Sequence, residues 1–170
     1  MRPACPLLPP VTSTLSWRDL ESASDQAELY RRCLRYAQQL WQANLPARAL
    51  LAVDRALYCD LRADDAALDE HPLPYAVIRW MIASDCGETF TGNARVHYQH
   101  LADRVRGPRA EIKRWRAWAG WALARVARPE LPNDPKHQVR EPDLREIEAG
   151  LRASGLPGEA ETWVKALEGP

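Results

Sequence analysis

Apolar residues recur every three or four positions along most of this chain, the spacing that places them on one side of an α-helix. The first clear example ends near Ala43, and either Ser16 or Ser24 can cap its start. Its apolar positions are Leu29, Cys33, Tyr36, Ala37, Leu40 and Trp41. The tripeptide Asn-Leu-Pro then interrupts the pattern. Pro46 suits the first turn of a second helix, because its missing N–H needs no partner there.

The same spacing predicts further helices in the rest of the chain. They cover residues 74–84, 94–105, 108–128, 143–154 and 158–167. The stretch YAVIRWMIAS is apolar nearly all round, and a strand is the rival interpretation because Val, Ile, Tyr and Trp favour strands. We prefer a helix, since no partner strand is evident elsewhere. The expected fold class is all-α: an irregular bundle of antiparallel helical hairpins with about six or seven helices.

Residues 1–15 form a separate segment in this interpretation. Prolines break its short apolar run, so it lacks the continuous apolar helix of a signal peptide. We expect a flexible arm at 1–15 and a single α-helical domain at 16–170. No window holds the roughly 18 apolar residues of a membrane span, so we expect a cytoplasmic protein with no membrane partner.

The chain has four cysteines, and they are too scattered to form a metal-binding pair or a disulfide framework. Cys5, Cys33, Cys59 and Cys86 are therefore expected to be free thiols in a reducing compartment. Cys33 and Cys59 lie within helical patterns and are interpreted as small core residues.

Large and small residues alternate in a particular order along the first helical pair. The positions that carry this order are Cys33, Tyr36, Ala37, Leu40, Ala49, Val53 and Ala56. The order resembles one degenerate unit of the tetratricopeptide family, although Cys33 replaces the family's Trp and Leu61 its Pro. The last helical pair matches at fewer positions: Leu144, Ile147, Leu151, Ala160 and Val164. The resemblance implies tetratricopeptide-like packing and the binding of a peptide or protein partner.

Charge is unevenly distributed, although the formal net charge of the whole chain is zero. Residues 92–128 hold nine basic and two acidic residues, a local net charge of +7. One interpretation is a basic face that binds phosphates. Its candidate residues are Arg104, Arg106, Arg109, Lys113 and Arg116. The preferred alternative is that acidic segments of the same chain pack against this basic region.

Three tryptophans lie close together in the predicted helix 108–128. A helical wheel places Trp115 and Trp118 in one apolar arc with Val126, so we interpret them as core residues. Trp121 falls in the more exposed arc, between Arg114 and Arg125. These last three residues form a candidate contact site, because stacking of Arg on Trp and interface hot spots both use such an arrangement.

His97 and His100 lie one helical turn apart and could in principle bind one metal ion. No cysteine or carboxylate stands at a supporting spacing, so exposed polar histidines are the preferred interpretation. The sequence lacks G-x-x-x-x-G-K-[ST], G-x-G-x-x-G, G-x-S-x-G and H-E-x-x-H motifs. We therefore assign no catalytic residue, metal ligand or cofactor.

These features support three hypotheses of function. The first is a non-enzymatic helical module that binds a protein or peptide. The second is a nucleic-acid-binding protein that uses the basic, Trp-rich region 92–128, where cations and aromatic rings alternate. The third is a small enzyme that depends on His97 and His100.

Overall fold

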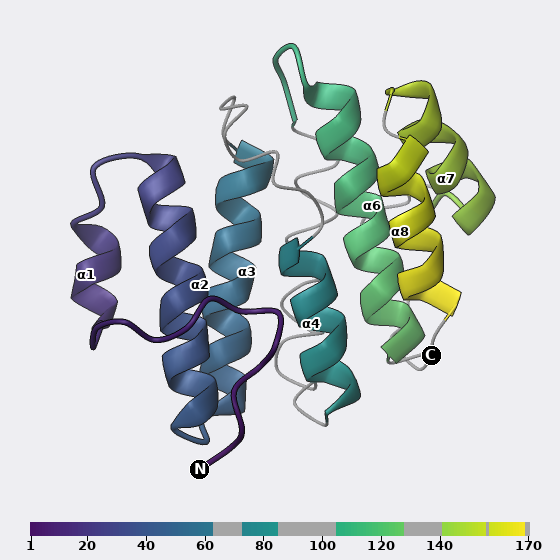
Figure 1. Ribbon diagram of the computed structural model, residues 1–170. Coiled ribbons are helices and arrows are strands. Elements are labelled where there is room, and N and C mark those ends of the chain that lie inside the picture. The colour runs from purple at the N-terminus through teal and green to yellow at the C-terminus, as the bar shows by residue number, and fades with distance from the viewer. Residues whose placement is uncertain (63–72, 85–104, 128–140, 156, 169–170) are drawn as a thin grey trace. The chain divides into compact units, whose positions relative to one another are not determined.

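The computed structural model describes residues 1–62, 73–84, 105–127, 141–155 and 157–168. These residues form seven helices and no strand, which confirms the all-α fold class (Figure 1). Contacts divide the chain into two compact units, Met1–Phe90 and Thr91–Pro170, where the sequence had predicted one domain. Each unit is described by itself below. None of the described helices is long and apolar enough to cross a membrane.

In the first unit, the helix expected to start at Ser16 or Ser24 is two helices. Helix α1 (Trp17–Glu21) follows Ser16, whose hydroxyl donates to the Asp19 carboxylate at 2.7 Å. Helix α2 (Gln26–Gln42) is capped by Asp25, whose carboxylate accepts the backbone N–H of Glu28 at 2.7 Å. Ser16 is therefore the cap of a short first helix, and the cap of the second helix is Asp25, one residue after the other candidate, Ser24.

Helices α2 and α3 (Pro46–Arg62) form the closely packed hairpin at the centre of this unit. The turn between them contains Asn44 at a φ of 61°, a left-handed conformation that Asn tolerates better than most residues. Ala37, Ala49 and Ala56 are completely buried, and their small side chains allow the two helix backbones to approach. The predicted start at Pro46 is confirmed.

The N-terminal segment, expected to be a flexible arm, instead lies against α2. Cys5 and Leu8 are buried, and the indole N–H of Trp41 donates to the Pro3 carbonyl oxygen at 2.9 Å. The amide of Gln38 is also buried, and it bonds both the N–H and the carbonyl of Cys5 at 3.0 Å. A buried amide without partners is costly, so Gln38 gives this segment a specific docking position that its proline content did not reveal.

Helix α4 (Leu73–Ala83) decides the alternative between helix and strand for the apolar stretch of the first unit. Tyr75, Val77, Ile78 and Met81 are buried, as the nearly uniform apolar pattern predicted. The ring of Trp80 lies 5.1 Å from that of Trp41, so α4 is held against the α2–α3 hairpin by aromatic as well as aliphatic contacts.

The interpretation of Cys33 and Cys59 as core residues is confirmed, and both are free thiols. Burial raises the pKa of Cys33 to about 12 and that of Cys59 to about 11. Because only the thiolate reacts, we expect iodoacetamide at pH 8 to leave both unmodified in the native protein and to alkylate both in denaturant. Peptide mapping by mass spectrometry checks this; rapid alkylation of either thiol in the native state would contradict it.

The second unit contains helices α6 (Ala110–Ala127), α7 (Leu144–Ala153) and α8 (Pro157–Glu168). Helix α7 packs against both α6 and α8. Its predicted cap is confirmed: Asp143 accepts the N–H of Glu146 at 2.9 Å, and the Glu146 carboxylate accepts the N–H of Asp143 at 2.8 Å. Gly155 follows the helix at a φ of 83°, the left-handed conformation for which glycine is the usual choice. The predicted helix at 94–105 lies almost entirely outside the described residues.

Candidate functional site

The middle of α6 is buried on all sides, which agrees with the expected burial of Trp118 and corrects the helical-wheel interpretation of Trp121. The side chain of Trp121, expected in the exposed arc, is only 2% exposed, whereas Val126, expected in the core, is 47% exposed. A wheel shows how residues are distributed around one helix, but it cannot show which arcs the neighbouring segments cover. Lys113 and Arg116 lie one turn apart on the same side of the helix, and both are buried as well.

Trp121 nevertheless lines a hollow on the surface of the second unit. The hollow has a volume of about 470 Å³ and opens between α6 and the segment that leads into α7. Helix α6 contributes residues at the three- and four-residue spacing of one face, and the rest come from 141–144. The lining residues are Trp118, Trp121, Ala122, Arg125, Val126, Glu141, Pro142, Asp143 and Leu144. We call this the Trp121 hollow.

Arg125 connects the two sides of the Trp121 hollow. Its guanidinium carbon lies 6.0 Å from the centre of the Trp121 ring, at the outer limit of a cation–π contact. The same guanidinium forms an ion pair with Glu141, which lies 16 residues further along the chain. This pair holds residue 141 against α6, and the cap at Asp143 then sets the direction in which α7 begins.

The sequence hypothesis grouped Trp121 with both Arg114 and Arg125, and the structure brings only one of these arginines to the hollow. Arg114 forms an ion pair with Glu111, one turn earlier on α6, and it does not line the hollow. The indole N–H of Trp121 has no acceptor among the described residues. The ring is too deeply buried to serve as an exposed hot spot, so it forms the floor of the hollow.

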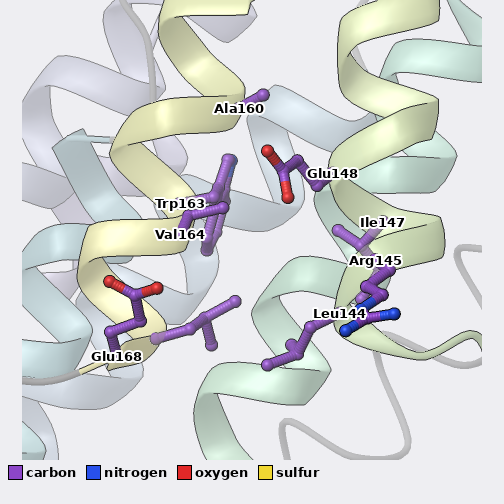
Figure 2. Close-up of a pocket in the computed structure, with 9 residues that line it drawn as sticks. Leu144, Arg145, Ile147, Glu148, Ala160, Trp163, Val164 and Glu168 are labelled. Atoms are coloured by element: carbon purple, nitrogen blue, oxygen red, sulfur yellow. The ribbon is translucent and has the colours of Figure 1, made fainter.

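A second hollow, shown in Figure 2, lies between α7 and α8 and has a volume of about 240 Å³. Its apolar lining includes Ile147 on α7 and Trp163 and Val164 on α8, and Figure 2 shows Trp163 between the two helices. Arg145, Glu148 and Glu168 supply the polar lining. We call this the Trp163 hollow.

Leu144 belongs to both hollows, and its side chain is 46% exposed. As the first residue of α7, it is held in place by the Asp143 cap, so the helix presents an isobutyl group to solvent between two apolar depressions. Single exposed leucines are ordinary on a protein surface. An exposed leucine that separates two apolar hollows is a less common feature.

The remaining basic candidates are divided between the surface and the interior. Lys113 and Arg116 are 1% and 2% exposed, so neither presents its charge to an external phosphate in this conformation. Arg116 forms two hydrogen bonds with Glu159 of α8, at 2.6 and 2.8 Å. Arg106 is exposed and Arg109 is half-buried. Arg104, His97 and His100 lie outside the described residues.

Other chemistry is sparse in the part of the chain that the structure describes. No group of three or more His, Cys, Asp or Glu side chains there could hold a metal ion. No family model, curated protein or solved structure matches this chain. The candidate site therefore depends on its geometry: two apolar hollows, an exposed leucine between them, and one ion pair at the edge.

Sequence reasoning missed Glu141, Pro142 and Leu144 as site residues. A signal was present for Leu144, because a large apolar residue directly after a capping aspartate starts a helix with one apolar side chain already in place. The contribution of Glu141 had no local signal, since its partner Arg125 is separated from it by the proline-rich segment.

Proposed function

We propose that this protein is a non-enzymatic helical module that binds a peptide segment of a partner protein on the second unit. The observation that carries the proposal is the exposed Leu144 between the Trp121 hollow and the Trp163 hollow. Large apolar side chains anchored in pockets supply most of the free energy of binding in protein interfaces. Two hollows that share one wall suit a ligand with two such anchors.

The chemistry of the two hollows favours a peptide with apolar anchors. Their polar lining consists of an ion pair, Arg125 with Glu141, and a few charged side chains at the edges. Amphipathic helices and extended segments both bind grooves of this kind, with anchors spaced along one side of the ligand. The resemblance to a tetratricopeptide unit supports the same class of function.

Nucleic-acid binding by the basic region receives less support from the described residues. Phosphate recognition requires several accessible cations, and log affinity falls with log salt in proportion to their number. Lys113 and Arg116 are enclosed, and Arg114 and Arg125 already pair with Glu111 and Glu141. Titration of a single-stranded oligonucleotide at low and high salt tests this second hypothesis directly.

Selection from a display library of random peptides tests the proposed function. We expect peptides with two large apolar residues to be enriched on the wild-type protein, and the Leu144→Glu substitution to weaken their binding at least about tenfold. A glutamate in the first turn of a helix is well tolerated, so this variant should fold. Fluorescence anisotropy with the selected peptides gives the dissociation constants.

The matched control is Ala149→Glu, which adds the same charge to an exposed position of α7 that lines neither hollow. It should change the same dissociation constants by less than about twofold. If no selected peptide distinguishes Leu144→Glu from Ala149→Glu, the second unit does not bind peptides at this surface and the proposal is wrong.

A further inference from the structure

The first unit carries a separate hollow, of about 270 Å³, where α1, α2 and α3 meet. Its lining residues are Trp17, Tyr36, Leu40, Arg48 and Leu51. Trp17 is 43% exposed and Leu51 is 36% exposed. We call this the Trp17 hollow.

The aromatic wall of the Trp17 hollow is held by side-chain contacts. The rings of Trp17 and Tyr36 lie 6.1 Å apart at an angle of 58°, close to an edge-to-face arrangement. The guanidinium carbon of Arg55 lies 5.0 Å from the centre of the Trp17 ring. These contacts fix an exposed tryptophan in one orientation, so the hollow is formed before any ligand binds.

Arg48 and Arg55, which form no ion pair with a described carboxylate, lie beside this wall. Arg48, Leu51 and Arg55 recur at three- and four-residue spacing along α3, and Tyr58 continues the same side of the helix. No carboxylate of the described residues forms an ion pair with Arg48 or Arg55. The surface around the hollow therefore carries two positive charges that no described carboxylate of the first unit pairs with.

Two of the acidic side chains on α1 and α2, those of Asp19 and Glu28, already have partners. Asp19 accepts the backbone N–H and the hydroxyl of Ser16, and Glu28 accepts those of Ser24 and pairs with Arg32. Asp54 on α3 also has an interaction of its own. The carboxylates of a ligand would supply the negative charge that none of the described side chains gives to Arg48 and Arg55.

We propose that the Trp17 hollow binds a segment of a partner protein in which a large apolar side chain is flanked by aspartate or glutamate. The apolar side chain would occupy the space between Trp17, Tyr36 and Leu51, and the carboxylates would pair with Arg48 and Arg55. This surface is distinct from the one around Leu144 and differs in its chemistry, so the inference goes beyond the proposed function.

An acidic peptide fits this surface better than a nucleic acid does. Base stacking needs a free aromatic face, whereas Arg55 lies over Trp17 and Tyr36 packs against it. Nucleic-acid backbones present a phosphate at each nucleotide, and two arginines match only a short stretch of that charge. A single apolar anchor with adjacent carboxylates uses both features of the hollow.

The test uses a display library of random peptides and four forms of the full chain: wild type, Arg48→Glu, Arg31→Glu and Leu144→Glu. Arg31 is exposed on α2 and does not line the Trp17 hollow, so its substitution is a matched charge reversal. We expect the wild type to enrich peptides that contain one large apolar residue among aspartates and glutamates. Arg48→Glu should weaken their binding by about tenfold or more, and the other two variants by less than about twofold.

Several results would overturn this inference. These are the absence of peptides that depend on Arg48, a set of such peptides without acidic residues, or an equal loss with Arg31→Glu. Binding of a single-stranded oligonucleotide that is lost with Arg48→Glu, in the absence of acidic peptides, would assign the surface to nucleic acid instead. Peptides that depend on Leu144 report only on the proposed function, so the two proposals can fail separately. Unchanged thermal unfolding of Arg48→Glu shows that the variant is folded.

Discussion

Replacing Glu159 by Gln is expected to lower the free energy of unfolding of the second unit by about 3–5 kcal/mol. Glu159 and Arg116 form an ion pair in which both side chains are 3% exposed, with two hydrogen bonds at 2.6 and 2.8 Å. The substitution keeps the shape of the side chain and removes its charge. Arg116 then stays buried but loses the carboxylate that pairs with its charge, which costs far more than the loss of one hydrogen bond.

A matched control separates this cost from that of losing any ion pair. Glu148 and Arg152 form a pair one turn apart on α7, and their side chains are 35% and 44% exposed. Because water screens such a pair, Glu148→Gln should cost less than about 1 kcal/mol. Urea-induced unfolding followed by circular dichroism measures both variants. Equal effects of the two substitutions would show that the buried pair has no special role.

The double variant Arg116→Met with Glu159→Leu completes the test. It removes both charges and fills the space with apolar groups, so its stability should be close to that of the wild type or above it. The coupling free energy between positions 116 and 159 is obtained by comparing the double variant with Arg116→Met alone and Glu159→Leu alone. It should be several times the error of the measurement. Additive effects would mean that Arg116 and Glu159 do not act as a pair.

The boundaries of several helices could be predicted from the sequence because local chemistry determines them. Asp143 caps α7 through atoms within four residues of itself, and Gly155 ends the helix with a backbone conformation that other residues avoid. Pro46 marks the start of α3 for a similarly local reason. Where the prediction missed, as with the two helices α1 and α2, Ser16 and Ser24 were taken as alternative starts of one helix, and Asp25, which caps α2, was not recognised.

The sequence analysis preferred an arrangement in which acidic segments pack against the basic region, as the Arg116–Glu159 and Arg125–Glu141 pairs do. Which charges are buried could not be predicted, because burial depends on a neighbour that the helix does not specify. Arg116 was named as a candidate of a basic face, since a long charged side chain on a helix usually reaches solvent. In the structure its partner Glu159 lies on α8, 43 residues away along the chain, and α8 packs against α6. The same reason explains the N-terminal segment, whose position depends on the buried amide of Gln38.

The candidate site was predictable only in the part that lies on one helix. Trp121 and Arg125 are four residues apart on α6, so helical geometry alone places them together. Glu141 and Leu144 line the same hollow because the start of α7 lies beside α6. The sequence does not specify this placement. The burial of Trp121 also changes which residue tests binding: Trp121→Ala would damage the core, whereas Leu144 is exposed.

Substituting alanine for Gly150 is expected to destabilise the second unit by about 1–3 kcal/mol, although alanine normally stabilises the interior of a helix. A Cβ atom at position 150 would overlap the indole of Trp115, which packs directly on the glycine backbone. The methyl group must therefore displace the ring or move α7 away from α6. The helix-propensity gain of roughly 1 kcal/mol offsets only part of this overlap.

Gly158 supplies the matched control, because a Cβ atom at this position of α8 would have nothing within 4 Å. Gly158→Ala should leave the stability unchanged or raise it by up to about 1 kcal/mol. The overlap at Gly150 should also disappear when the ring is removed, so Gly150→Ala should cost little when it is added to a Trp115→Leu variant. Urea-induced unfolding of the wild type and of the four variants measures these differences. The variants are Gly158→Ala, Gly150→Ala, Trp115→Leu and the combination of the last two. If Gly150→Ala is as harmless as Gly158→Ala, the close packing of α7 on α6 through Trp115 is wrong. The shape of both hollows depends on where α7 begins, so it must then be revised as well.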